Sequence, residues 1–306
     1  MPAHICSTIF GNRTKLLAAV VGIVAVKVIA RVASRTIAKR RHAAELAKLE
    51  KNVIHLFSFP RWSGGPNFST PCFRIEAFLR LAKLPYRIHF TMDAAKSPTE
   101  RLPYIVYNDT ILADSEFISQ FLTKEMKLQV DSHLTPKDHA LGLATKRLVE
   151  GSLQFGSARI MNVDNPAFVA ALYSAELGVP LFVAKFFVRG MRKSYIKLLN
   201  TVGHGDLTDA QFKSEMIRDY KALEALIGDK PFLLGDRPSS YDCSLYANLQ
   251  FFIALGLKTP EFDYLRSSAV LAPYVQRLDK ILFPDMATVV DVKKAKSQYF
   301  QGGESQ

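Results

Sequence analysis

The chain has 306 residues, which is enough for two compact domains once a tail is set aside. Its 40 Lys and Arg against 28 Asp and Glu give a formal net charge of +12, which suggests a nucleic acid or an anionic membrane face as partner. The basic residues of 31–41 crowd behind an apolar run, and no aromatic side chains interleave with them as they would on a base-stacking surface. We therefore expect a membrane and no nucleic acid.

The three cysteines are Cys6, Cys72 and Cys243. Their odd number and wide spacing indicate neither a disulfide framework nor a closely spaced metal site. Direct chelation of a soft metal is disfavoured as well, because such metals bind clustered thiolates. We expect a reducing location, with the folded part facing the cytoplasm and no bound metal.

The N-terminal region, 1–52, is predicted to be a membrane anchor followed by a basic helical spacer. The apolar run Leu16–Val26 continues past Lys27 to Ala30, somewhat short of the roughly 20 residues that span a bilayer. A cleaved signal peptide is the alternative, since basic residues precede the run and small residues follow it. The stronger positive cluster on the C-terminal side favours an anchor that keeps the rest of the chain in the cytosol.

Residues 53–128 alternate strand and helix signals in a thioredoxin-like order, β-α-β followed by β-β-α. Ser69 stands where a helix N-cap is expected, before apolar residues at helical spacing. The predicted strands cover Val53–Phe57, Pro85–Phe90, Tyr104–Tyr107 and Ile111–Ala113, and the predicted helices run from Ser69 to Ala82 and from Ser115 to Met126.

Beyond a polar linker at 129–137, strand signals fade and helical periodicity dominates residues 138–285, before a tail at 286–306. The predicted helices are about Asp138–Met161, Leu181–Leu199, Asp209–Ile227, Ser240–Leu255 and Ser268–Leu282. The fold class is therefore an α/β thioredoxin-like domain plus an all-α domain, preceded by an apolar helix.

Four local motifs, in this order, resemble those of the glutathione transferase superfamily. They are Ser69-Thr70-Pro71-Cys72, Leu102-Pro103, Asp114-Ser115 and the segment Gly235–Asp242. The resemblance implies that Ser69 activates glutathione, that the backbone around Leu102 and a cis Pro103 pairs with its peptide part, and that Asp114 and Ser115 bind its γ-glutamyl group.

Each of these residues also has a purely structural interpretation. A hydroxyl and a helix N-terminus both stabilise a thiolate, so Ser69 suits glutathione activation, yet most serines in this setting only cap the helix. Pro103 can simply start a strand, and Asp114 with Ser115 can cap the next helix. Cys72 is expected to be a buried packing residue. Arg61, Trp62, Arg74 and Arg101 lie nearest the expected cleft, and none is assigned firmly to the glycine carboxylate of glutathione.

A closer resemblance is to the branch of failed-axon-connections proteins, nematode cadmium-responsive proteins and metaxins. The residues behind it are Phe59-Pro60-Arg61, Arg74, Glu76 and Ala77–Ala82. This branch implies a membrane-associated protein at a lysosomal or other endomembrane, or at the mitochondrial outer membrane.

The sequence departs from that of active glutathione transferases in two ways that bear on catalytic activity. Residues 61–68 are inserted between the first strand and Ser69, and Glu116 stands where many active transferases carry arginine. Two hypotheses result. The first is a membrane-associated transferase-like protein, able to form a homodimer, that uses glutathione and a small electrophile in a stress or detoxification response. The second is an inactive scaffold at a membrane, of the metaxin or axonal-development kind.

Overall fold

The computed structural model describes residue 46 and residues 48–286 of the chain. The predicted anchor, most of its spacer and the tail beyond Met286 lie outside the described residues. The chain divides into two units between Asn52 and Val53, and the second unit holds every strand and helix named below. Within the part that the structure describes, no helix combines the length and hydropathy needed to cross a bilayer.

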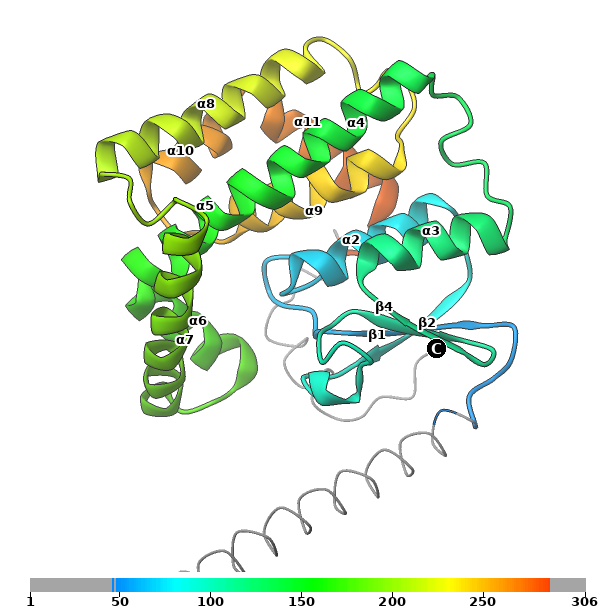
Figure 1. The fold of residues 1–306 in the computed structure, drawn as a ribbon, viewed down its shortest axis with the longest axis horizontal. Coiled ribbons are helices and arrows are strands. Elements are labelled where there is room, and N and C mark those ends of the chain that lie inside the picture. The colour runs from blue at the N-terminus through cyan, green and yellow to red at the C-terminus, as the bar shows by residue number, and fades with distance from the viewer. Residues whose placement is uncertain (1–45, 47, 287–306) are drawn as a thin grey trace, which may run out of the picture. The chain divides into compact units, whose positions relative to one another are not determined.

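The first half is built on a four-stranded sheet in the order β2-β1-β3-β4. Strand β1 is parallel to β2 and antiparallel to β3, and β3 is antiparallel to β4. Helices α2 and α3 cover one face of the sheet (Figure 1), which gives the expected thioredoxin-like half. The elements are β1 (Ile54–Ser58), α2 (Thr70–Leu81), β2 (Tyr86–Phe90), β3 (Tyr104–Tyr107), β4 (Thr110–Ala113) and α3 (Ser115–Glu125).

The second half is helical, as the periodicity predicts. Its helices are α4 (Pro136–Leu148), α5 (Gln154–Ala158), α6 (Pro166–Leu177), α7 (Leu181–Thr201), α8 (Asp209–Ile227), α9 (Ser240–Ala254), α10 (Pro260–Ser267) and α11 (Leu271–Leu282). The single helix expected over 138–161 is α4 and α5, which are joined by a wide π-type turn at Val149–Leu153. A second π-type turn, at Arg159–Asp164, follows α5. Helices α6 and α10 fall where the sequence pattern predicts no helix.

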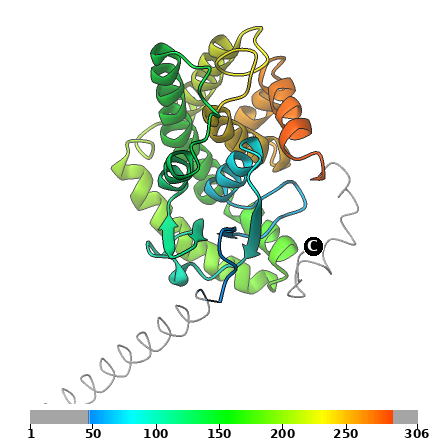
Figure 2. The ribbon, with the colours of Figure 1, turned by 90° about the vertical axis from the view of Figure 1, so that its right-hand side faces the viewer.

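Helix α9 forms the centre of the core and packs against α2, as Figures 1 and 2 both show. Its N-terminus is held by the buried carboxylate of Asp242, which accepts hydrogen bonds from Ser239 N (2.8 Å), Ser239 Oγ (2.7 Å) and Tyr274 Oη (2.8 Å). A buried carboxylate needs several donors to offset its lost hydration. The Ser239 and Asp242 pair singled out in the sequence is thus a structural anchor for the helical half.

Candidate functional site

The sheet register brings the predicted site residues to one edge. Phe57 near the end of β1 and Ala113 at the end of β4 both pair with Tyr104 at the start of β3. The residues beyond these strand ends therefore share an edge: the loop to Ser69 after β1, Pro103 before β3 and Asp114 after β4. The peptide bond between Leu102 and Pro103 is cis, as the resemblance implies, and both residues are buried.

Ser69 occupies the N-cap position of α2, but its side chain makes no capping hydrogen bond. Its backbone N–H donates instead to Oδ1 of the buried Asn67 (2.9 Å). Burial raises the pKa of the Cys72 thiol, and hydrogen bonding by the hydroxyls of Ser69 and Ser58 acts against that rise. The hydroxyl that would activate a bound thiol is thus next to a thiol of the protein itself, and Cys72 is the buried packing residue that was expected.

Asp114 and Ser115 both have partners within the protein. The carboxylate of Asp114 caps α3 by accepting a hydrogen bond from Glu116 N (2.8 Å). The hydroxyl of Ser115, which is 5% exposed, accepts a hydrogen bond from the guanidinium of Arg74. The capping alternative describes what Asp114 does here, while binding of a γ-glutamyl group by this pair stays a prediction.

Arg74 belongs to an ion-pair network that sequence reasoning missed. Its guanidinium contacts Glu150 and lies 3.7 Å from the Glu116 carboxylate, which in turn contacts Lys146. Burial and the neighbouring charge of Arg74 lower the pKa of Lys146 to about 8, although the carboxylates of Glu150 and Asp114 act in the opposite direction. The spacing of Lys146 and Glu150 along one helix was the available signal, but it did not show that they face Arg74 and Glu116.

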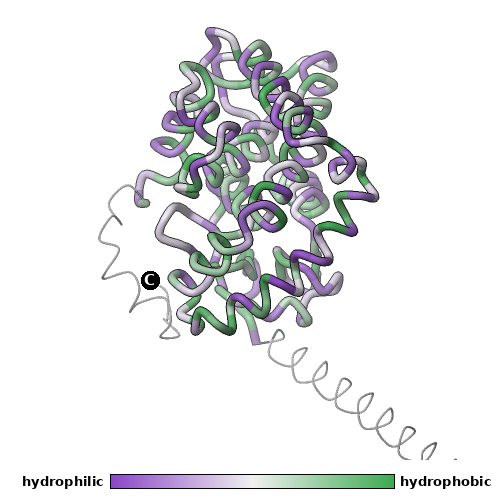
Figure 3. Tube along the Cα trace, turned by 90° about the vertical axis from the view of Figure 1, so that its left-hand side faces the viewer, coloured by the Kyte–Doolittle hydropathy of each residue, from purple (hydrophilic) through white to green (hydrophobic). Residues whose placement is uncertain are grey.

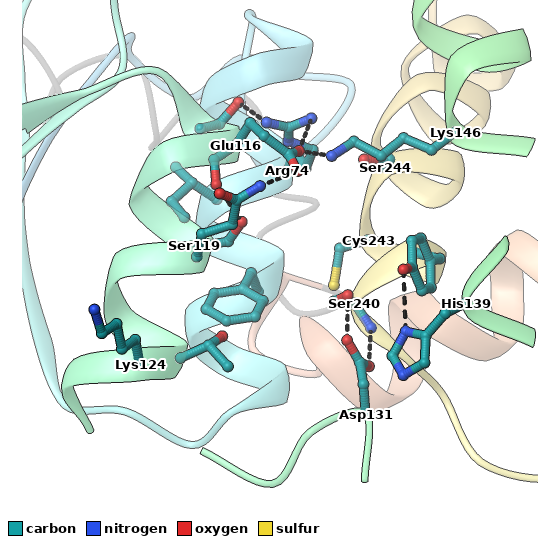
Figure 4. A pocket seen from close by; sticks show the side chains of 16 residues that line it. Arg74, Glu116, Ser119, Lys124, Asp131, His139, Lys146, Ser240, Cys243 and Ser244 are labelled. Carbon is teal, nitrogen blue, oxygen red and sulfur yellow. Dashed lines mark hydrogen bonds and ion pairs between the residues drawn. The ribbon is translucent and has the colours of Figure 1, made fainter. Parts of the chain in front are cut away.

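Arg74, Glu116 and Lys146 of this network line one end of a cavity of about 340 Å³ between α2, α3, α4 and α9 (Figure 4). At the other end Asp131 accepts a hydrogen bond from Ser240 N (2.8 Å), and His139 Nδ1 lies 3.2 Å from Tyr241 Oη. The cavity includes Ser115 but neither Ser69 nor Pro103. It is therefore a charged hollow that shares only Ser115 with the predicted glutathione site.

The inserted loop, residues 61–68, begins with an ion pair. Arg61 Nη2 lies 2.7 Å from Oε1 of the fully buried Glu76, and Arg61 Nη1 lies 3.2 Å from its Oε2. Arg61 is thereby committed to a carboxylate of the protein, as is Arg74. Arg101 is the third arginine considered for the glycine carboxylate of glutathione, and its side chain is exposed.

The same loop is docked onto the helical half. Trp62 is only 7% exposed, and its ring centroid lies 5.2 Å from that of Phe251 on α9. Ser63 N donates to the Glu176 carboxylate on α6 (2.9 Å), and Gln250 Nε2 on α9 donates to Gly64 O (3.1 Å). The loop therefore bridges the end of β1 to α6 and α9.

Glycines are required where this loop turns. A Cβ at Gly64 would lie 2.6 Å from the Trp62 ring, and a Cβ at Gly65 would lie 2.7 Å from the Gln250 amide. Trp62 and Gly65 also pair through their backbones across the turn. The two small residues thus let the loop fold back tightly beneath its own tryptophan.

Among the described residues, no group of three or more His, Cys, Asp or Glu side chains is placed to hold a metal ion.

Two family models match the chain in the order that the fold shows. One describes the N-terminal domain of glutathione S-transferase and covers residues 70–165, and the other describes its C-terminal domain and covers residues 216–278. The two matches agree with the thioredoxin-like half, the cis proline and the helical half of the structure, and together these features define the class of protein. The chain belongs to the glutathione transferase-like superfamily.

The relatives narrow this class to a branch. Failed axon connections of Drosophila melanogaster is 27% identical over 248 residues, which are 77% of this chain and 59% of that protein. The mitochondrial outer membrane import complex protein METAXIN of Arabidopsis thaliana is 25% identical over 199 residues, 61% of each chain. The isoprene-epoxide glutathione S-transferase of a Rhodococcus strain is 26% identical over 239 residues, 72% of this chain and 95% of that enzyme. The chain is thus related to the failed-axon-connections and metaxin branch.

Proposed function

We propose that this chain is an interaction module on a glutathione transferase fold, which works at a membrane and does not transfer glutathione. The observation that carries the proposal is the docking of Trp62 against Phe251 of α9. A transferase needs room for an electrophile beside the activated thiol, and the loop that leads to Ser69 is packed onto the helical half. With its aromatic side chain 7% exposed, Trp62 takes up space that a second substrate would need.

The surroundings of Ser115 support the same conclusion. The Ser115 hydroxyl accepts a hydrogen bond from Arg74, the cation nearest to where the resemblance places the γ-glutamyl group. Arg74 is held by Glu150 as well, and removing one partner from a half-buried charge cluster is costly. The charge of Arg74 is therefore already paired with a carboxylate of the protein, which leaves it less free to attract the carboxylate of a γ-glutamyl group.

Support for the membrane comes from the sequence and from relatives. The apolar run before the basic cluster of 31–41 is predicted to be an anchor, and the net charge of +12 favours an anionic surface. One relative carries the name of a mitochondrial outer membrane import complex protein. We propose that the folded part faces the cytoplasm, at the mitochondrial outer membrane or an endomembrane.

A second candidate is a working glutathione transferase with a role in stress or detoxification. It is favoured by the shared sheet edge that gathers Ser69, cis Pro103 and Asp114, and by the relative named as a glutathione S-transferase. In this candidate Ser69 would donate a hydrogen bond to the glutathione sulfur at the N-terminus of α2.

Steady-state conjugation of glutathione to a chloronitrobenzene or an epoxide separates the two candidates. The full chain is expected to leave the uncatalysed rate unchanged. A saturable rate that disappears in Ser69→Ala, but persists in the capping variant Thr208→Ala on α8, would contradict the proposal and establish the transferase.

A further inference from the structure

Helix α7 exposes an unusual number of large apolar side chains. Its buried side is narrow and includes the small residues Ala184 and Val188, one turn apart. The apolar side chains exposed in its first two turns are Leu181 (44%), Phe182 (75%), Val183 (41%), Phe186 (83%) and Phe187 (58%). Apolar side chains exposed singly are normal on a protein surface, whereas a contiguous group of this kind marks a docking surface.

The same helix is strongly basic. It carries five cations and no Asp or Glu, and the side chains Lys185, Arg189, Arg192, Lys193 and Lys197 are all exposed. The acidic residue of the preceding helix, Glu176, is held by the loop residue Ser63. Figure 3 faces the side on which Figure 1 places α6 and α7, and hydrophobic and hydrophilic residues alternate along the helix that crosses its front.

Phenylalanines interleaved with long cationic side chains suit the boundary between lipid headgroups and acyl chains. The rings enter the apolar layer, while Lys and Arg extend their stems along it and keep their charges among anionic headgroups. A second copy of the chain fits less well, because two such basic faces would repel each other. Leu181 and Val183 beside the rings also favour lipid over stacked bases, since aliphatic side chains offer bases no aromatic platform.

We propose that the first two turns of α7, with Lys185, Arg189 and Lys193, form a surface that docks onto an anionic phospholipid bilayer. This inference rests on the proposed function for its membrane setting and adds a contact independent of the predicted N-terminal anchor. Residues 166–215, which contain α6 and α7, lie between the two family matches. The surface therefore lies in a part of the chain that neither family match covers.

The single native tryptophan makes a site-specific test possible. Phe186→Trp in the full chain is mixed with vesicles of phosphatidylcholine and phosphatidylserine whose acyl chains carry bromine, a contact quencher of tryptophan. The variant keeps Trp62, so the signal is the emission that the introduced tryptophan adds to that of Trp62. This added emission is expected to shift to shorter wavelength and to be largely quenched. The matched control is Phe117→Trp, at an equally apolar and 59% exposed position on α3, and Trp62 in the unchanged chain is the internal reference. We expect bromine to quench neither the tryptophan introduced by Phe117→Trp nor Trp62.

The triple variant Lys185→Gln, Arg189→Gln and Lys193→Gln, made in the Phe186→Trp background, should lose most of the quenching. It should do so with an unchanged circular dichroism spectrum, because all three side chains are exposed. Equal quenching in pure phosphatidylcholine would overturn the requirement for anionic lipid.

The remaining outcomes each reject the surface in a distinguishable way. If the chain floats with vesicles but Phe186→Trp is quenched no more than Phe117→Trp, the anchor stands and the α7 surface is rejected. If the chain does not associate with vesicles at all, both the membrane setting and the surface fail. Displacement of the vesicles by a single-stranded oligonucleotide, or self-association that buries the tryptophan introduced by Phe186→Trp without lipid, would assign α7 to another partner.

Discussion

Arg61 and Glu76 form a bidentate ion pair that ties the inserted loop to helix α2, with Nη2 2.7 Å from Oε1. Glu76 is fully buried and also accepts hydrogen bonds from Tyr86 Oη (2.9 Å) and Arg80 Nη2 (3.3 Å). A single carboxylate therefore joins the loop, the helix and strand β2. The loop before Ser69 and the helix after it are therefore held together.

Glu76→Gln is expected to lower the free energy of unfolding by about 3 kcal/mol, since it leaves Arg61 without a charged partner in a buried setting. The value lies at the low end for buried pairs because Arg80 keeps Asp285 as a second partner. Urea unfolding followed by far-ultraviolet circular dichroism measures it. Glu215→Gln, which removes an exposed pair with Arg218, is the matched control and should change stability by less than about 0.5 kcal/mol. Equal losses in the two variants would rule out a special role for Glu76.

Ser69→Ala should leave the stability nearly unchanged, by less than about 0.5 kcal/mol, because the Ser69 side chain makes no capping hydrogen bond. The comparison is Thr208→Ala on α8, where the hydroxyl accepts from Gln211 N (3.3 Å) within a capping box. That variant should lose about 1 kcal/mol. A loss at Ser69 as large as the loss at Thr208 would show that Ser69 serves the helix after all.

Stability should fall on acidification through the titration of His89. Burial, then the nearby His55 and Arg87, lower the pKa of His89 below its ordinary value of 6.5. The unfolded chain then binds more protons than the folded chain between the two pKa values, so the stabilisation is present above 6.5 and declines below it. His89→Gln should flatten the loss of stability between about pH 7 and pH 5.5. A slope left unchanged by His89→Gln would refute the role of His89.

Glu176→Ala should loosen the inserted loop, because Glu176 accepts hydrogen bonds from both Ser63 N and Ser63 Oγ. The expected result is faster proteolytic cleavage within 61–68, measured by mass spectrometry of limited digests. Glu215→Ala supplies the control for loss of an exposed glutamate elsewhere. If cleavage in the loop is equally slow in both variants, the Trp62 and Gln250 contacts suffice to hold it.

Much of the fold could be predicted from the sequence because the deciding signals are local. The strand Tyr104–Tyr107 and the helix Asp209–Ile227 match the structure at both ends. Helix α6 was missed because Pro166–Leu177 is apolar on most sides and shows little periodicity. Helix α10 was missed although Thr259 and Pro260 form a start signal, because eight residues give too short a pattern.

The candidate site was harder to predict because its decisive contacts join distant residues. The positions of Ser69, Pro103 and Asp114 followed from the resemblance, and their use in binding stays a prediction. The docking of Ser63 onto Glu176 spans 113 residues, and the pairing of Arg74 with Glu150 spans 76. The spacing of residues along the chain does not reveal contacts between such distant positions. The inserted residues 61–68 could therefore be recognised in the sequence, but their contacts with α6 and α9 could not be predicted.

The proposal that the inserted loop takes up substrate space is tested most directly by the fluorescence of Trp62, the only tryptophan in the chain. A ring that is 7% exposed and packed against Phe251 should emit at short wavelength and resist quenching by acrylamide. Its emission should also stay unchanged when glutathione is added at millimolar concentration with an electrophile analogue. An accessible Trp62, or emission that shifts with saturable dependence on glutathione, would contradict the account and show that the loop opens to admit substrates.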